Sequence, residues 1–164
     1  MDYLWSPWRY QYVTSGAQVP EGGDPCLFCR IAAQSDDRAN YVVLRAERNF
    51  VMLNRFPYAT GHLLIAPYEH VATLEEAKTE TMEELIRLAQ HTEAALRRIY
   101  HAGGLNLGFN IGQCAGAGVA GHIHMHVLPR WHGDTSFVTT VGETRVLPEA
   151  LETTYDRVVE ALRG

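Results

Sequence analysis

The chain has 164 residues, of which 46% are hydrophobic and 20% are charged, so one domain can bury a sizeable core. Its net charge of −5 argues against a general nucleic-acid binder, although a locally positive pocket can still hold a small anion. No apolar run reaches the roughly 20 residues that span a bilayer, and the N-terminus lacks the features of a secretory signal. We therefore expect a cytoplasmic protein that binds neither nucleic acid nor membrane.

Residues 1–25 are expected to form an N-terminal arm and loop. Tryptophan and tyrosine are costly to leave in water, so we expect the arm to dock on its own domain or on a partner subunit. A loop rich in proline and glycine follows at residues 20–25. Residues 26–164 are expected to form a single domain. The aromatic residues of the arm are Trp5, Trp8, Tyr10 and Tyr12.

Apolar runs predict three strands, at residues 41–44, 50–53 and 62–66, with a tight turn between the last two. After these strands, the spacing of the apolar residues changes. Apolar residues within 82–100 recur at spacings of three, four and seven, which predicts one amphipathic helix. Thr81 and Glu84 are expected to form a capping box at its start, and Gly103 and Gly104 mark its end.

Two further strands are expected at residues 105–111 and 123–128, joined by a loop of small residues at 112–121. A second helix is expected after Pro148 and runs near the C-terminus. This order of elements predicts an α+β fold in which a largely antiparallel sheet carries a long helix.

Three histidines, His122, His124 and His126, alternate with apolar residues in the last predicted strand. Side chains two apart on a strand point the same way, so the three are expected to line one face. A cluster of half-buried imidazoles is costly unless a metal, a phosphate or catalysis occupies it. The spacing leaves two alternatives: a three-histidine metal site, or a nucleophilic histidine with helpers.

The loop directly before the histidines contains Gly112, Gly116, Gly118 and Gly121. Such a loop lets backbone N–H groups approach an anion closely. Glycine-rich loops are also common as simple flexible connections. The position of this one, next to the histidines, favours phosphate chemistry.

Cys26 and Cys29 have the spacing of a zinc half-site. Buried cysteines or a redox pair are the alternatives, and a redox pair is disfavoured because no βαβ context surrounds the motif. With Cys114 the cysteines number three, and an odd count in a reducing compartment argues against a disulfide framework.

Residues 121–131, Gly-His-Ile-His-Met-His-Val-Leu-Pro-Arg-Trp, resemble the signature of the histidine triad family. Residues 58–67 resemble an earlier strand of that family. Residues 4–9, 107–112 and 129–137 resemble its longer bacterial branch, which includes diadenosine tetraphosphate phosphorylases. The resemblance covers nearly the whole chain. It implies a histidine triad fold, an antiparallel sheet of about five strands with a long amphipathic helix and a C-terminal helix, in protomers that pair into homodimers.

The resemblance also implies a mechanism. His124 would attack the α-phosphorus of an adenine dinucleoside polyphosphate, and water or phosphate would then cleave the covalent nucleotidyl-histidine. His126 would donate a hydrogen bond to the phosphate, and His62 would orient the nucleophilic ring. The expected nucleotide-binding residues are Asn54, Asn110, Gly116, Gly118 and Trp131. The alternatives are an adenosine phosphoramidate hydrolase, a nucleotide-binding regulatory protein, or a metal-binding interaction module.

The resemblance further implies a structural zinc, for which iron can substitute because ligand type does not settle metal identity. In this assignment His122 holds the metal and leaves His124 to react. Residues 117–120 lack the serine or threonine that many members of the family carry before the triad, which leaves the choice of substrate open. The four expected ligands are Cys26, Cys29, His70 and His122.

Overall fold

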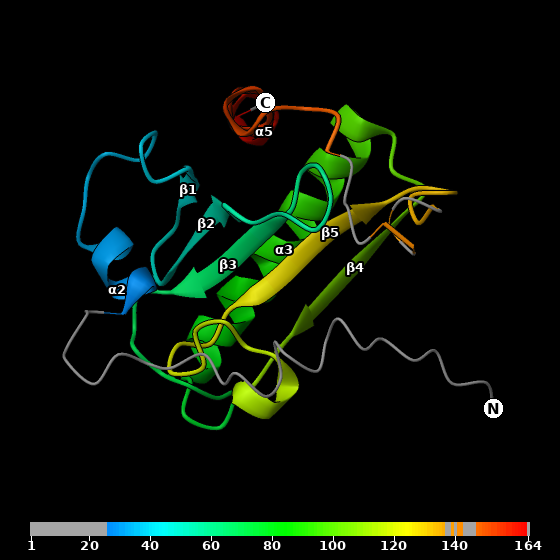
Figure 1. The fold of residues 1–164 in the computed structure, drawn as a ribbon. Coiled ribbons are helices and arrows are strands. Elements are labelled where there is room, and N and C mark those ends of the chain that lie inside the picture. Colours follow the sequence, from blue (N-terminus) through cyan, green and yellow to red (C-terminus); the bar gives the residue numbers. More distant parts are fainter. Residues whose placement is uncertain (1–25, 137–138, 140, 143–146, 164) are drawn as a thin grey trace.

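The computed structural model describes residues 26–136, 139, 141–142 and 147–163, and the expected arm at 1–25 lies outside them. Five strands form one antiparallel sheet in the order β1-β2-β3-β5-β4 (Figure 1). The predicted α+β fold class is confirmed. The strands are β1 (Val42–Arg45), β2 (Asn49–Leu53), β3 (Leu63–Pro67), β4 (Gly104–Phe109) and β5 (Met125–Arg130).

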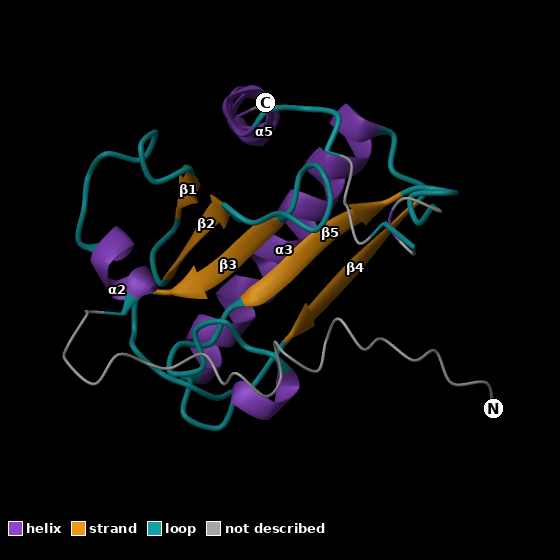
Figure 2. Cartoon of the chain, in the orientation of Figure 1, coloured by secondary structure: helices purple, strands orange, loops and turns teal. Residues whose placement is uncertain are grey.

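Two helices, α3 (Thr79–Tyr100) and α5 (Leu151–Arg163), share the main core with one face of the sheet. Figure 2 shows α3 running behind the strands. Alternation along β2 explains how both faces are covered. Val51 and Leu53 face this core, while Phe50 and Met52 face the other side, so the whole strand is buried. None of the helices in the described residues is long and apolar enough to cross a bilayer.

The opposite face carries a short helix, α2 (Leu27–Ala32), which the sequence analysis did not predict. Phe28 and Ile31 of α2 pack against residues from β1, β2 and β3. None of the buried residues in this second cluster comes from β4 or β5. Helix α2 therefore packs on the half of this face that β1, β2 and β3 form.

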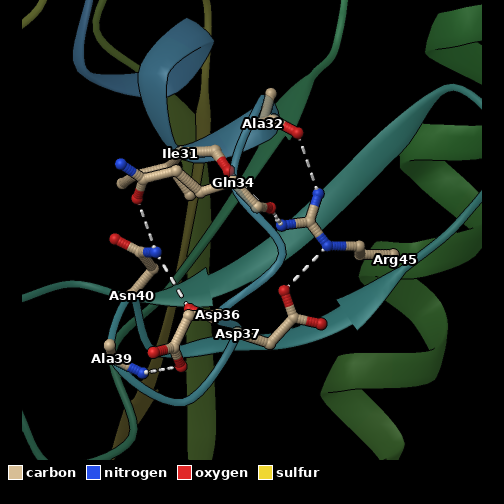
Figure 3. Close-up of polar contacts among 8 residues, drawn as sticks. All are labelled: Ile31, Ala32, Gln34, Asp36, Asp37, Ala39, Asn40 and Arg45. Atoms are coloured by element: carbon tan, nitrogen blue, oxygen red, sulfur yellow. Dashed lines mark hydrogen bonds and ion pairs between the residues drawn. The ribbon is translucent and has the colours of Figure 1, made fainter.

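Arg45 of β1 fastens α2 to the sheet (Figure 3). Its guanidinium donates hydrogen bonds to the backbone carbonyl oxygens of Ile31, Ala32 and Gln34, at 3.3, 3.2 and 2.7 Å. It also pairs with the carboxylate of Asp37 at 2.8 Å. The last carbonyls of a helix have no partner within the helix, so Arg45 helps to satisfy the C-terminal end of α2, together with the backbone N–H groups of Ala33 and Gln34.

Strand β5 begins later than expected, at Met125, so His126 lies in the strand while His122 and His124 precede it. The backbone N–H of Ile123 donates to the carbonyl of Val71 at 2.7 Å, outside the sheet ladder. His122, Ile123, His124 and Met125 are all buried. The prediction that all three histidines lie in one strand is therefore wrong, although the rings of His122 and His124 both pack on Phe28.

The capping box predicted for the long helix is also wrong. Helix α3 starts at Thr79 after Lys78, and no side chain caps it. The Glu84 carboxylate instead accepts hydrogen bonds from the backbone N–H groups of Glu47 and Arg48, at 3.1 and 2.9 Å. The helix ends at Tyr100 and His101 adopts the left-handed conformation, so the stop falls two residues before the predicted Gly103.

Candidate metal centre and active site

The four expected metal ligands, Cys26, Cys29, His70 and His122, converge beside α2, with their ligand atoms all within 4.8 Å of one another. The Nδ1 atom of His122 lies 3.3 Å from Cys26 Sγ and 3.6 Å from Cys29 Sγ. His70 Nδ1 lies 3.2 Å from Cys29 Sγ. Ligands of a tetrahedral zinc ion are separated by about 3.3–3.8 Å, as follows from zinc–nitrogen and zinc–sulfur bond lengths. The three distances given lie close to this range, and two thiolates with two imidazoles are a donor set typical of structural zinc.

The tautomer of His122 suits this role. Its Nε2 atom lies 2.9 Å from the carbonyl oxygen of Pro67, which only accepts hydrogen bonds, so Nε2 carries the hydrogen. The lone pair is then on Nδ1, which faces the two cysteines. Burial lowers the pKa of His122 and keeps the ring neutral, as a metal ligand must be. Burial raises the pKa of Cys29, and nearby Cys26 raises it further, so a bound cation is what would hold Cys29 as a thiolate.

His124 is almost fully buried, with 4% of its surface exposed. Its Nδ1 atom lies 2.9 Å from the backbone carbonyl of His122 and must donate to it. Nε2 therefore carries the lone pair, and burial lowers the pKa of the ring so that it stays neutral. The ring of Phe28 packs against it, with centroids 4.8 Å apart. A neutral imidazole held by its other nitrogen has the form that a nucleophile requires.

His126 and His62 form a hydrogen-bonded pair, with 2.9 Å between His126 Nδ1 and His62 Nε2. The backbone N–H of Tyr58 donates to His62 Nδ1 at 3.1 Å, and Asn54 Nδ2 lies 3.3 Å from the same atom. His62 Nδ1 is therefore an acceptor and its Nε2 the donor. His126 Nδ1 in turn accepts, which places the hydrogen of His126 on Nε2.

This arrangement differs from the expectation that His62 orients His124. The hydrogen bond of His62 Nε2 goes to His126, and the His122 carbonyl orients His124. His124 and His126 are neighbours, with ring centroids 5.1 Å apart. Burial, and then the proximity of His124, lowers the pKa of His126 to about 4. His126 is therefore a neutral donor near pH 7.

The expected nucleotide-binding residues lie at different distances from these histidines. Asn54 contacts His62, and its Oδ1 accepts from the N–H of Phe56 at 2.9 Å. Asn110 directly follows β4, whose last residue pairs with Met125. Gly116 has φ +86° and donates its N–H to the carbonyl of Gln113, so it shapes the loop. Gly118 is exposed.

Trp131 is not brought to the triad. It follows the C-terminal end of β5, at the opposite end of that strand from His124. Its Nε1 donates to the carbonyl of Tyr100 at 3.0 Å. Two other aromatic residues beside the histidines were not predicted from the sequence. Phe28 packs on His122 and His124, and Tyr58 packs on His62 and His126. In the sequence, the position of Phe28 between the two cysteines could have indicated that it lies beside the site.

The chain resembles known proteins over most of its length. Residues 36–133 match the HIT domain family, whose name abbreviates histidine triad. A Mycobacterium tuberculosis protein named AP-4-A phosphorylase is 34% identical over 157 residues, which cover 92% of this chain and 79% of that protein. A zinc-bound histidine triad family protein from Mycobacterium smegmatis superposes with a TM-score of 0.70 at 30% identity, covering 87% of this chain and 96% of the other.

A further solved structure, a hypothetical histidine triad nucleotide-binding protein from Sulfolobus tokodaii, superposes with a TM-score of 0.68 at 29% identity, over 84% of this chain and 92% of that one. The family match spans well over half of the chain and includes all three histidines of the motif. With the observed five-stranded sheet, these similarities establish that the chain belongs to the histidine triad family.

Proposed function

We propose that this protein cleaves an adenine dinucleoside polyphosphate, such as diadenosine tetraphosphate, through a covalent nucleotidyl-histidine on His124. The observation that carries the proposal is the state of that ring: buried, neutral, and held through Nδ1 so that Nε2 keeps its lone pair. Similarity to a protein named AP-4-A phosphorylase supports this substrate class.

The reaction takes place in two displacements. His124 Nε2 attacks the α-phosphorus, a P–N bond forms, and the P–O bond to the leaving nucleotide breaks with its electron pair on that oxygen. The ring then carries a positive charge, which the hydrogen bond from Nδ1 to the His122 carbonyl stabilises. An oxygen of inorganic phosphate or water next attacks phosphorus, the P–N bond breaks, and His124 returns to its neutral form. Water, unlike a phosphate dianion, must lose a proton in this step.

His126 is proposed to donate its Nε2 hydrogen to a phosphate oxygen during both displacements. The chain of hydrogen bonds from the Tyr58 N–H through His62 supports this role, since it leaves the hydrogen on that nitrogen. Asn54 contributes to the same chain. The other residues proposed to contact nucleotide are Asn110, Gly116 and Gly118 around the loop before the triad, and Trp131.

We also propose that Cys26, Cys29, His70 and His122 hold a structural zinc ion, or iron in its place. The convergence of four suitable donors supports the proposal, and so does the zinc-bound relative from Mycobacterium smegmatis. The ion closes the link between α2 and the segment before β5, and takes no part in either displacement. Elemental analysis should find that Cys26→Ala and His70→Ala lose the metal while His124→Ala keeps it. Loss from His124→Ala would instead favour a three-histidine site.

The activity is tested with diadenosine tetraphosphate in the presence and absence of inorganic phosphate. ADP plus ATP identifies phosphorolysis, and AMP plus ATP identifies hydrolysis. His124→Ala should lower kcat by several orders of magnitude while nucleotide binding remains, as expected when a covalent nucleophile is removed. Turnover of adenosine phosphoramidate alone would favour that alternative substrate. Nucleotide binding by the wild-type protein without any turnover would favour a regulatory protein.

A further inference from the structure

A second cavity lies away from His124, with a volume of about 910 Å³, which is within the size range of small-molecule sites. It opens where the C-terminal end of β5 meets the start of β4, the end of α3 and helix α5. The end of β5 and the start of β4 lie together at the right of Figure 1. We call this cavity the distal pocket. The lining residues that matter for its chemistry are Tyr58, Tyr100, Asn106, Arg130, Trp131 and Arg157.

The distal pocket is aromatic, and its charges are paired. Tyr100 and Trp131 meet at 87° with ring centroids 6.3 Å apart. Arg130 is bonded to both carboxylate oxygens of Asp134, at 2.6 and 2.8 Å. Arg157 is paired with Glu149 at 2.6 Å. Two arginines are thus balanced by two carboxylates, which favours a flat, uncharged heterocycle over a phosphate group.

The distal pocket is joined to the active site. Tyr58 lines it and also lies nearly parallel to the His126 ring, at 16° with centroids 6.0 Å apart. Met125 and Val127 face the core of α3, so His126, Leu128 and Arg130 point to the other side of the sheet. From His126 to Arg130 the strand rises by about 13 Å. Helix α2 packs on β1, β2 and β3, so among the described residues this helix does not separate His126 from the distal pocket.

We propose that the distal pocket binds the second nucleoside of the dinucleoside polyphosphate, the one that departs with the leaving nucleotide. The inference rests on the proposed function. With the first nucleoside at His124, the bridging phosphates pass His126 and follow β5, and the second base reaches the pocket between Tyr58, Tyr100 and Trp131. Binding energy from both ends of the substrate then orients the attacked phosphorus. The span of β5 sets the length of polyphosphate that fits best.

The test narrows the path with Leu128→Trp, because Leu128 is half-buried and lines the pocket between His126 and Arg130. The control, Ile86→Trp, adds the same bulk at a half-exposed position of α3 outside the pocket. The measured quantity is the ratio of kcat/KM for diadenosine tetraphosphate to that for adenosine phosphoramidate, which carries a single nucleoside. Leu128→Trp should lower this ratio about tenfold, the size of one lost base–aromatic contact. Ile86→Trp should leave it within about twofold.

A second variant covers the case in which Leu128→Trp does not fold. Trp131→Leu should lower the same ratio, and Trp131→Phe should restore most of it because a flat face returns. If Leu128→Trp and Trp131→Leu lowered kcat/KM equally for both substrates, the proposed role of the distal pocket would be overturned. Failure of the wild-type protein to turn over either substrate would overturn the proposed function instead.

A binding measurement further distinguishes a failure of the distal pocket from a failure of the proposed function. In the His124→Ala protein, calorimetric titration should show weaker binding of diadenosine tetraphosphate when Leu128→Trp is added, while AMP binding stays the same. An unchanged affinity for diadenosine tetraphosphate would contradict the distal pocket whatever the catalytic result.

Discussion

His122 and His124 are two residues apart, but their hydrogen bonds give them opposite tautomers. The Pro67 carbonyl takes the Nε2 hydrogen of His122, and the His122 carbonyl takes the Nδ1 hydrogen of His124. The lone pair is therefore on Nδ1 in His122, beside the two cysteines, and on Nε2 in His124. A difference in backbone acceptors thus distinguishes the proposed metal ligand from the proposed nucleophile.

The low pKa of His126, about 4, also makes protein stability depend on pH. In an unfolded chain a histidine has a pKa of about 6.5, so between these values the unfolded state binds more protons than the folded state. Stability should therefore fall as the pH is lowered from 6.5 toward 4. Thermal unfolding at pH 7 and pH 4.5 should show a larger drop in Tm for the wild-type protein than for His126→Gln. Protonation of the metal ligands affects both proteins alike, and an equal drop in both would contradict the shifted pKa.

At the scale of elements, α2 depends on contacts from outside itself, because six residues are too few for a stable isolated helix. We expect Arg45→Ala to loosen α2 and lower zinc affinity by about tenfold or more, the range seen when groups that support metal ligands are removed. Competition with a chromophoric chelator measures the affinity. Arg48→Ala is the matched control, since Arg48 pairs with exposed Glu47 and makes none of these contacts. Equal affinity in the two variants would contradict a role for Arg45 in holding the metal site.

The elements also differ in how far local sequence predicts them. The 22 residues of α3 repeat a helical period six times, so the helix and its end were predicted closely. Helix α2 is too short to show a period, and Arg45 of β1 completes its C-terminal end. Residues 122–126 alternate as a strand does, but the backbone N–H of Ile123 bonds to Val71, outside the sheet ladder. His122 and His124 therefore precede the strand. These errors share one cause, which is contact between residues far apart in sequence.

For the molecule as a whole, the expected homodimer remains a proposal. Strand β4 is an edge of the sheet, it contains no charged residue, and Leu107 in it is 41% exposed. Edge strands usually carry charges that prevent pairing, so this one suits a second copy of the chain. Leu107→Lys should convert the dimer to a monomer in light scattering, whereas Ile86→Lys on α3 should not. A wild-type monomer, or a Leu107→Lys dimer, would contradict pairing through β4.

At the scale of the whole molecule, the histidine motif predicts only part of the candidate site. The four candidate metal ligands lie together as the resemblance implied, and the rings of His124 and His126 are neighbours. The distal pocket has walls from β4, β5, α3, α5 and the turn before β3, and no single stretch of sequence contains its pattern. Trp131 was assigned to the nucleotide from the resemblance, but its distance from His124 along β5 became visible only in the fold.

We propose that His124 becomes covalently linked to a nucleotide. The most direct measurement is to mix the enzyme rapidly with diadenosine tetraphosphate labelled at the α-phosphates, quench in base, and locate the label by mass spectrometry. An acid-labile nucleotide on His124 is expected in the wild-type protein, and none in the folded His124→Ala protein. Turnover without any protein-bound nucleotide, or a nucleotide on another residue, would contradict the claim.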